Sequence, residues 1–369
     1  MFQIMHCAGR GRTDVADLTL FVDHDLRLAR VALLFALWIG FEALRSPQPV
    51  RGATLWMITC RDLAILGMIG TLLAEQQDLR LLNKLVFLLG VGLAIVSLVL
   101  YGRALSNERL ILIDPDNAVA VFESGVMRLE GFAGDPNFFA LFLSVSFLCG
   151  LAAGRSRPVA LKWAGLFMIG VALLFSFSRG FLLSLVLSTS LLGVIGILRG
   201  NSLWRRYAAK VLLPLVAVGV VALVVPVPYV GVSPLNWLLV RIVDIAARPS
   251  WPAWAKLLPM TLDHPIIGYG LRMGETVLEG QYSHNSYLDL LLETGIVGLC
   301  IYLLFVILVI KRGVRLSSEA ADVLPWFHAC LLTLFMFFFF SILYNPFSWV
   351  VAGVILAQSP CPTRTKALP

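Results

Sequence analysis

Charged residues are scarce in this sequence. Only 14% of its 369 residues are Asp, Glu, Lys or Arg, whereas soluble domains contain about 25%. The shortage is matched by an excess of hydrophobic residues, which make up 59% of the chain. This balance excludes an ordinary soluble domain and indicates a membrane protein.

Cysteines with the spacing of a zinc site or a disulfide framework are also missing. Four of the six cysteines lie inside apolar runs, and the other two lie near the ends of the chain. The scattered pattern gives no sign of either kind of site. The six are Cys7, Cys60, Cys149, Cys300, Cys330 and Cys361.

The amino-terminal residues 1–26 lack the apolar core of a signal peptide. They are polar, carry Arg10 and Arg12, and precede the first apolar run. We therefore expect residues 1–26 to be a cytoplasmic N-terminal tail with little structure of its own.

Long apolar runs dominate the rest of the chain. Several exceed the roughly 20 residues that a helix needs to cross a bilayer, and a helix satisfies its own backbone hydrogen bonds in lipid. The sequence therefore predicts an all-α fold, a polytopic helical membrane protein with about ten transmembrane helices in a single domain at residues 27–359. The expected spans are about 27–44, 53–74, 85–105, 136–154, 159–177, from just after Gly180 to Leu198, 211–226, 286–310, 323–343 and a tilted or partial one at 348–359.

Basic residues set the expected orientation. They gather in short loops at residues 155–162, 199–210 and 311–315, as Lys and Arg do on the cytoplasmic side of membranes. This pattern explains the net charge of +7 better than nucleic-acid binding does. It places both termini in the cytoplasm, including a tail at residues 360–369, and it leaves a large periplasmic loop at residues 228–285 between spans seven and eight.

Four charged residues depart from this pattern. Arg45 and Arg51 fall on the outer side, against the rule for basic residues. Arg61 and Asp62 lie inside the second expected span, where charges are costly and commonly functional. Because adjacent helical residues point about 100° apart, we expect each of the two to have a partner elsewhere. A functional role and a structural pair between helices are both open.

Three arginines share the outer side in this topology: Arg128, Arg179 and Arg248. A guanidinium stays charged and offers a planar fork of donors that suits phosphate oxygens. Arg179 sits in a very short turn between two spans, and Arg248 precedes Trp254 in an interfacial loop. Such a group at headgroup level would suit a lipid pyrophosphate. Contact with lipid headgroups is the alternative for Arg128 and for Arg272.

His284 is the candidate general base. Ser283, His284 and Asn285 are expected to cap the eighth span, which places the imidazole in the first turn, at the positive end of the helix dipole. That position disfavours the imidazolium form, and a general base must be neutral. The alternative is that His284 is only a neighbour of the helix cap.

Other residues of the outer side suggest the shape of a site. Gly268 and Gly270 allow a tight turn, Trp251–Leu262 could form a short helix on the membrane surface, and Glu293 could bond a neighbouring helix or line a cavity. No tight cluster of carboxylates, His or Cys is evident there, since Asp114-Pro-Asp116 is the nearest to one. We therefore predict no metal and no other cofactor.

Taken in order, these residues resemble the O-antigen ligase and O-antigen/exopolysaccharide polymerase superfamily of bacterial inner membranes. The resemblance covers about residues 128–304 and is carried by the ordered set rather than by any single motif. The set is Asp-Pro-Asn137 at the head of a span, Phe-Ser-Arg179-Gly180 between two spans, Arg248 with Trp254 after it, His264-Pro-Ile-Ile-Gly268-Tyr-Gly270, His284-Asn285-Ser-Tyr-Leu and Glu293-Thr-Gly-Ile-Val-Gly298.

The resemblance implies a metal-independent, inverting glycosyltransferase. Such an enzyme moves a glycan from undecaprenyl pyrophosphate to a glycan or lipid acceptor at the periplasmic face of the inner membrane. Its partners are therefore the polyprenyl-pyrophosphate-linked glycan, the acceptor and membrane lipid, without nucleic acid. Arg179, Arg248 and Arg128 would bind the pyrophosphate, and His284 would activate the acceptor. Asn137, Gly268, Gly270, Asn285 and Glu293 would shape the site.

Two other functions are compatible with many apolar spans. A transporter or flippase of lipid-linked glycans would show internal repeats and helices interrupted at mid-membrane. No repeat is evident in this sequence, and the special residues gather at one face. A non-catalytic scaffold would leave the arginines and the histidine unexplained.

Overall fold

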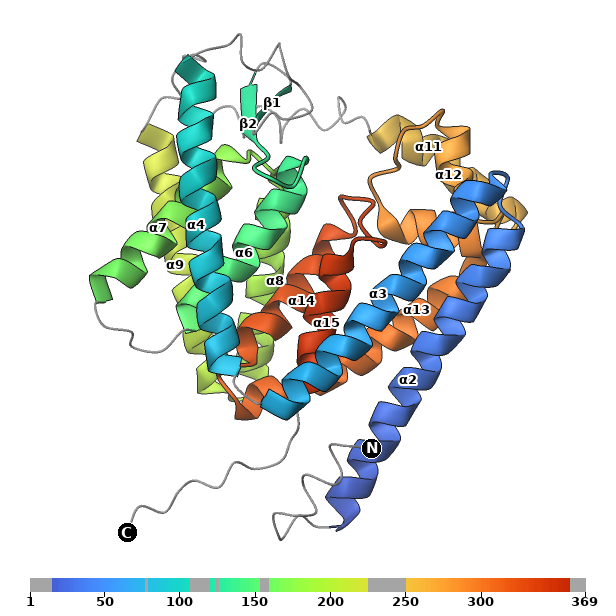
Figure 1. Ribbon diagram of the computed structural model, residues 1–369, viewed down its shortest axis with the longest axis horizontal. Helices are drawn as coiled ribbons and strands as arrows, with labels where there is room; N and C mark the ends of the chain where they lie inside the picture. The colour runs from blue at the N-terminus through green and yellow to red at the C-terminus, as the bar shows by residue number, and fades with distance from the viewer. Residues whose placement is uncertain are drawn as a thin grey trace. The chain divides into compact units, whose positions relative to one another are not determined.

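The structure is a computed structural model, and it describes residues 15–76, 79–106, 120–123, 126–152, 159–224 and 250–358. By its internal contacts the chain forms two compact units, each assembled from segments that are distant in the sequence (Figure 1). The first unit comprises Met1–Asp78, Pro252–Glu319 and Ser341–Pro369, and the second comprises Leu79–Trp251 and Ala320–Phe340.

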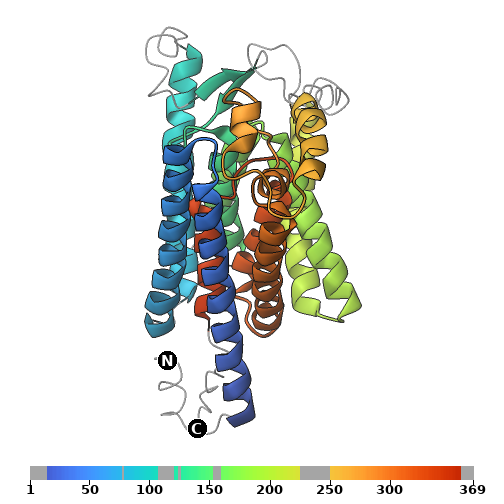
Figure 2. The same ribbon diagram turned by 90° about the vertical axis from the view of Figure 1, so that its right-hand side faces the viewer.

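Long helices build the first unit. They are α2 (Val15–Leu44), α3 (Pro49–Gln76), α13 (Ser286–Glu319) and α15 (Pro346–Ala357), with the shorter α11 (Ser250–Asp263) and α12 (Met273–Val277). Both α2 and α15 pack against α3 and against α13, and Figures 1 and 2 show α2 running beside α3. Phe35 joins three of these helices, because its ring centroid lies 5.6 Å from that of Tyr302 and 6.2 Å from that of Trp349.

The second unit is also mainly helical. It contains α4 (Leu79–Ser106), β1 (Ala120–Glu123), β2 (Val126–Leu129), α6 (Pro136–Ala152), α7 (Val159–Phe175), α8 (Arg179–Leu198), α9 (Ser202–Val224) and α14 (Leu324–Met336). α4 packs on α6 and α7, and α8 packs on α9 and α14. Buried polar groups join α14 to α8, since His328 Nε2 lies 3.1 Å from both Ser188 Oγ and Thr189 Oγ1.

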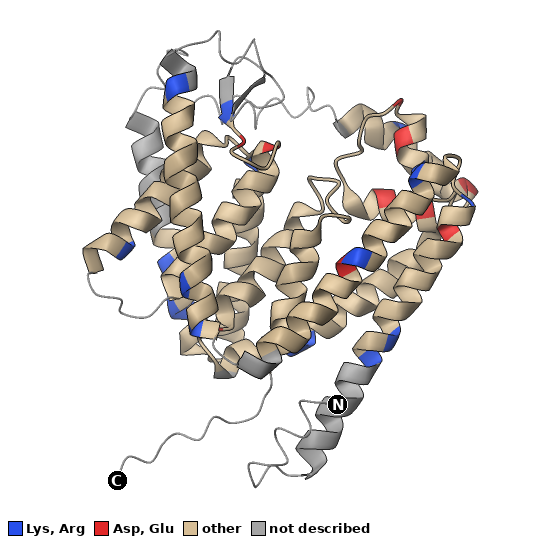
Figure 3. Cartoon of the chain, in the orientation of Figure 1, with Lys and Arg blue, Asp and Glu red and all other residues tan. Residues whose placement is uncertain are grey.

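Four of the described helices are long and apolar enough to cross a membrane. These stretches are Pro49–Leu73, Leu79–Arg103, Arg179–Leu198 and Ser286–Ser318. Shorter apolar helices accompany them, namely α6, α7, α14 and α15. Figure 3 shows how long the uncharged parts of these helices are. The finding supports a multi-pass helical membrane protein, and the count of ten spans stays a prediction, as do the domain boundaries.

Local capping signals place several helix starts where the sequence predicts them. α6 begins at Pro136, and the Asp135 carboxylate accepts from the amide of Asn137 at 2.6 Å. α8 begins at Arg179 with Ser178 as its N-cap. α11 matches the short helix expected at Trp251–Leu262. A proline or a hydroxyl at the right position is enough to fix these boundaries.

Two helices extend further than the sequence predicts. α2 begins at Val15, inside the tail predicted at residues 1–26 to have little structure. α9 begins at Ser202, inside the basic segment predicted as a loop, because Asn201 Oδ1 accepts from the amide of Leu203 at 3.0 Å and caps the helix. Basic residues mark a membrane side, and they are equally compatible with helix and loop.

The fold is mainly helical, as predicted, and it contains one short pair of strands in addition. β1 and β2 form an antiparallel pair in which Val121 lies opposite Arg128. Each strand has four residues, too few for an alternating pattern to be recognised in the sequence. The hairpin places Arg128 on β2, close in sequence to the start of α6.

The charged pair inside α3 also corrects a prediction. Arg61 Nε and Nη2 donate to Asp62 Oδ1 at 2.9 and 2.6 Å, so the neighbours do pair with one another. The long arginine side chain bends around the helix to reach its neighbour, and pairing lowers the cost of both charges in lipid. The contact supports a structural role for the pair.

Candidate functional site

In the first unit, the His264–Gly270 loop fills a break in α13. The break lies at Gly295, whose φ of 64° and ψ of −170° are not helical. The amides of Tyr269 and Gly270 donate to helix carbonyls before the break at 3.0 and 2.9 Å, and two amides after it donate to loop carbonyls at 2.8 and 3.2 Å. The two motifs, distant in the sequence, are therefore two halves of one backbone structure.

Glycine is required where the loop enters the break. Gly268 has a φ of 68°, and a Cβ there would lie 2.6 Å from the carbonyl carbon of Glu293. Gly270 has a φ of 95°, and a Cβ there would lie 2.5 Å from the carbonyl oxygen of Arg45. The expected tight turn is thus confirmed, and close backbone contact adds a second reason for glycine.

Arg45 holds the same loop from the end of α2. Its Nη1 and Nη2 donate to the carbonyls of Ile267 and Gly268, both at 3.0 Å, and Nη1 also pairs with the buried Glu42 at 2.7 Å. The next residue, Ser46, donates its hydroxyl to the carbonyl that follows Gly270 at 2.7 Å. We call this set the Arg45 clamp. It gives a structural reason for an arginine that departs from the rule for basic residues.

Arg272 follows the loop in a left-handed conformation, with a φ of 67°. Its amide donates to Glu293 Oε1 at 2.9 Å, and its Nη1 pairs with Glu275 at 2.6 Å. Arg51 binds the other oxygen of Glu275 at 2.8 Å, so that one carboxylate bridges two arginines. Burial opposes the charge of Arg272, but the carboxylates of Glu275 and Glu293 raise its pKa overall. Arg272 is therefore held inside the unit as a fixed cation.

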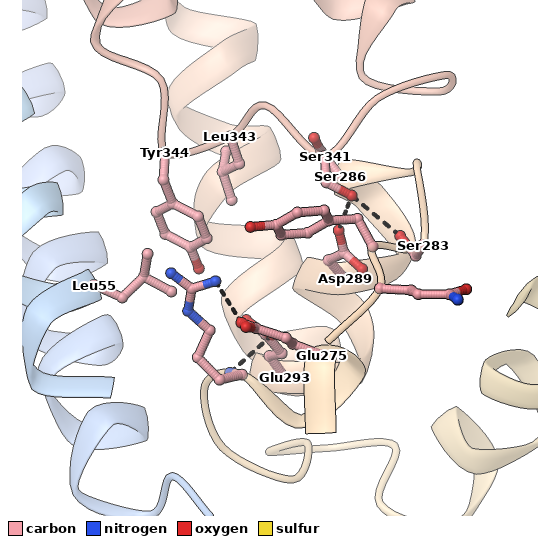
Figure 4. A pocket seen from close by; sticks show the side chains of 12 residues that line it. Leu55, Glu275, Ser283, Ser286, Asp289, Glu293, Ser341, Leu343 and Tyr344 are labelled. Atoms are coloured by element: carbon pink, nitrogen blue, oxygen red, sulfur yellow. Dashed lines mark hydrogen bonds and ion pairs between the residues drawn. The ribbon is translucent and has the colours of Figure 1, made fainter. Parts of the chain in front are cut away.

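A small pocket of about 50 Å³ opens beside these groups (Figure 4). We call it the Arg272 pocket. Asp289 of α13 points into it and accepts from Ser341 Oγ at 2.6 Å. Of the two roles left open for Glu293, the structure shows the place in the lining; its hydrogen bond goes to the amide of Arg272 in the loop and not to a neighbouring helix. The full lining is Leu55, Arg272, Glu275, Gln281, Tyr282, Ser283, Ser286, Asp289, Glu293, Ser341, Leu343 and Tyr344.

Tyr344 reaches the Arg272 pocket from the turn before α15. Its hydroxyl is buried and has no hydrogen-bond partner among the described residues. Burial raises the pKa of Tyr344 well above its ordinary value, and the charges of Glu293 and Asp289 raise it further. Tyr344 therefore offers an uncharged hydroxyl, which can both donate and accept.

His284 lies beside the pocket, between lining residues Ser283 and Ser286. Its side chain is exposed, and its backbone is left-handed, with a φ of 55°. The predicted cap is confirmed, because Asn285 Oδ1 accepts from the second and third amides of α13 at 3.1 Å each. α13 begins at Ser286, so the predicted place of His284 in the first turn is wrong. The imidazole precedes the cap, still close to the positive end of the helix.

In the second unit, one network joins two of the predicted residues, Arg128 and Asn137, to the turn before Arg179. Arg128 is buried, and it donates to the Ser176 carbonyl at 3.0 Å and to Asn137 Oδ1 at 3.2 Å. Ser178 Oγ donates to the same oxygen of Asn137 at 2.7 Å. Asn137 thereby ties the start of α6 to the turn that presents Arg179. Arg128 is bonded inside the unit, which argues against the alternative of simple headgroup contact.

The turn before α8 concentrates positive charge. Arg179 is the first residue of the helix, where the positive end of the helix dipole adds to the guanidinium. Phe177, two residues earlier, has a φ of 48°. Close to Arg128, burial and the Asp135 carboxylate raise the pKa of Glu130, although Arg128 lowers it. This end of the unit is therefore suited to an anion.

The predicted site residues thus fall into two described groups. Arg128, Asn137 and Arg179 belong to the second unit, and the loop glycines, His284 and its neighbours belong to the first. Arg248 lies outside the described residues. That the arginines and the imidazole share one site stays a prediction.

Sequence reasoning missed several residues of the first group. Arg45 carried a signal, because it broke the expected distribution of basic residues. Asp289 also carried one, because an acid in the first turn of an apolar span is unusual. Ser341 and Tyr344 carried none, since nothing local relates them to a helix more than 40 residues earlier.

Comparison with known families agrees with these motifs. A family model described as O-Antigen ligase matches residues 164–303. The matched segment contains Arg179, the loop glycines and the His284–Glu293 stretch, and it confirms the resemblance read from the sequence. No curated protein matches the chain.

Proposed function

We propose that the protein transfers a glycan from a polyprenyl pyrophosphate to an acceptor hydroxyl, because its residues 164–303 match the family model described as O-Antigen ligase. The reaction takes place at the periplasmic face of the bacterial inner membrane. The family match carries the proposal, since the matched segment holds both Arg179 and His284. The interlock between the His264–Gly270 loop and α13 supports it, because it explains why these motifs occur together.

Arginines neutralise the leaving group in the proposed reaction. The bond between the anomeric carbon and the pyrophosphate oxygen breaks, and the polyprenyl pyrophosphate leaves with an additional negative charge. Arg179 and Arg248 bind the phosphate oxygens, and Arg128 adds a third positive charge close to the turn that holds Arg179. Fixed cations placed where charge develops stabilise the transition state without reorganisation.

His284 activates the acceptor in the same step. The acceptor oxygen attacks the anomeric carbon from the side opposite the pyrophosphate, which inverts the configuration, and its proton passes to the imidazole. A positioned general base commonly contributes a factor of about 10² to 10⁴. The exposed side chain and the left-handed backbone of His284 are consistent with this use.

The break in α13 does not favour the transporter alternative. Interrupted helices of transporters leave backbone groups free to bind substrate at mid-membrane. Here the break at Gly295 comes nine residues after the helix begins, and loop amides already occupy the carbonyls before it.

Purified protein tests the proposal when it is mixed with a polyprenyl-pyrophosphate oligosaccharide and candidate acceptors, and the products are analysed by mass spectrometry. The wild type should form product, and a chelator should not slow it. His284→Ala should fold and lose roughly 10²-fold or more of the rate. His264→Ala is the matched control, because this second exposed imidazole only stacks on Tyr269, at 4.3 Å between ring centroids. Full transfer by His284→Ala would remove the proposed base.

A further inference from the structure

We propose that the Arg272 pocket binds uncharged hydroxyl groups of the acceptor sugar and holds that sugar beside His284. This inference rests on the proposed function, because it assigns the acceptor side of the same reaction. It is drawn from the charge of the pocket, from two buried groups without partners, and from the place of the pocket in the chain.

The charge of the pocket lining separates this pocket from a pyrophosphate site. Three carboxylates, those of Glu275, Asp289 and Glu293, face one guanidinium, that of Arg272. Glu275 balances the charge of Arg272, and the two other acidic side chains add no positive charge, so the lining does not attract an anion. A sugar hydroxyl carries no charge, can donate to a carboxylate, and can accept from a guanidinium. The lining therefore fits the hydroxyls of a glycan better than phosphate.

Two polar groups of the lining have no partner in the described part of the chain. They are the hydroxyl of Tyr344 and Nε of Arg272, both buried. Native proteins rarely leave such groups unsatisfied, and each one that remains calls for an explanation. A hydroxyl pair of a bound sugar would accept from Arg272 and exchange a hydrogen bond with Tyr344. Both groups belong to residues of the lining, so the hydroxyls of a bound sugar are the partners that we assign to them.

Several of the residues that line the pocket are close in sequence to His284, which supports the assignment of the bound sugar to the acceptor. Ser283 and Ser286 line the pocket, and His284 lies between them. Adjacent Cα atoms are about 3.8 Å apart, so a sugar held by the lining lies next to the backbone of His284. A volume of about 50 Å³ leaves room for one edge of a sugar ring, not for a disaccharide. Hydrogen bonds to one edge of the sugar ring would orient the attacking hydroxyl, and correct orientation of reacting groups increases the rate.

Tyr344→Phe is the sharpest test, because it removes only the hydroxyl without a partner. In the full-length protein we expect the KM for the acceptor to rise roughly threefold to tenfold, as for one lost hydrogen bond. The KM for the donor should stay unchanged, and the melting temperature should stay equal or rise. A residue with a merely structural role would not separate the two KM values. Tyr207→Phe is the matched control, since Tyr207 also has a buried hydroxyl without a described partner and does not line the pocket.

A binding experiment separates this inference from the proposed function. The probes are phosphate-free oligosaccharides, released by mild acid from the lipid-linked glycan and from the surface glycolipids of the source cells. Saturation-transfer NMR should show that the wild type binds one of these oligosaccharides. Pyrophosphate should not displace the bound oligosaccharide, and Tyr344→Phe should bind it more weakly. Binding without transfer would overturn the proposed function and keep the pocket assignment. No binding by the wild type, or equal binding and equal acceptor KM in Tyr344→Phe, would overturn the inference.

Discussion

Backbone strain in this protein gathers at single residues near the candidate site. Four described residues other than glycine have a positive φ, namely Phe177, Arg272, Glu279 and His284. Each such conformation costs of order 1–3 kcal/mol unless the surroundings hold it. Phe177 precedes the turn of Arg179, Arg272 lines the pocket and His284 is the proposed base. Three of the four strained positions therefore set the direction of a side chain to which we assign a function.

At the scale of single residues, the prediction concerns Arg179. Arg179→Ala should lower kcat/KM for the lipid-linked donor by roughly 10²-fold, as the loss of one fixed group that stabilises transition-state charge does. Arg179→Lys should recover part of the activity, since a point charge replaces the fork of donors. Arg199→Ala is the matched control, because Arg199 is exposed and lies at the other end of α8. Equal rates for Arg179→Ala and Arg199→Ala would contradict the assignment.

At the scale of elements, the loop and the broken helix depend on a third element. α2 supplies the Arg45 clamp, which bonds the loop carbonyls while the loop amides bond α13. Backbone contacts of this kind allow no substitution at the glycines and little movement between the elements. The clamp therefore fixes the segment that leads into Arg272 and the pocket.

Loss of the clamp should be visible as local opening. Arg45→Ala removes two charge-assisted hydrogen bonds and leaves the buried Glu42 without its arginine. We expect the amides of Tyr269 and Gly270 to exchange hydrogen at least about tenfold faster, because hydrogen bonds to charged groups are worth roughly 1.5–3 kcal/mol. Mass-detected hydrogen exchange would measure it. Arg80→Ala, which breaks an exposed ion pair with Asp322, is the control, and equal exchange in both variants would refute the role of the clamp.

At the scale of the whole molecule, the sequence predicts what local signals determine. The starts of α6 and α8 follow from Pro136 and Ser178, and the apolar runs locate most of the helices. The break at Gly295 and the Arg45 clamp could not be predicted, because they depend on contacts between segments far apart in the chain. The same holds for the Arg272 pocket, and the roles of Glu293 and the loop glycines in the site stay predictions.

The orientation in the membrane is the prediction at this scale. Glu279→Cys should react with a membrane-impermeant thiol reagent in intact cells, since Glu279 is exposed in the loop predicted to be periplasmic. Arg315→Cys, on the side predicted to be cytoplasmic, should react only after permeabilisation. Cys60 and Cys300 lie within apolar helices, so labelling of the wild-type protein gives the background for both variants. The opposite labelling of the two variants would invert the topology.

The Arg45 clamp also has a consequence for folding of the protein during its synthesis. Arg45 emerges from the ribosome 222 residues before Ile267, the first carbonyl that it binds. Ser341, which bonds Asp289, and Tyr344 follow later still. A nascent chain released before Ser341 should insert into the membrane, carry His284 on it, and remain inert when supplied with donor and acceptor. The cell would thus gain activity only from chains that have been synthesised past Tyr344.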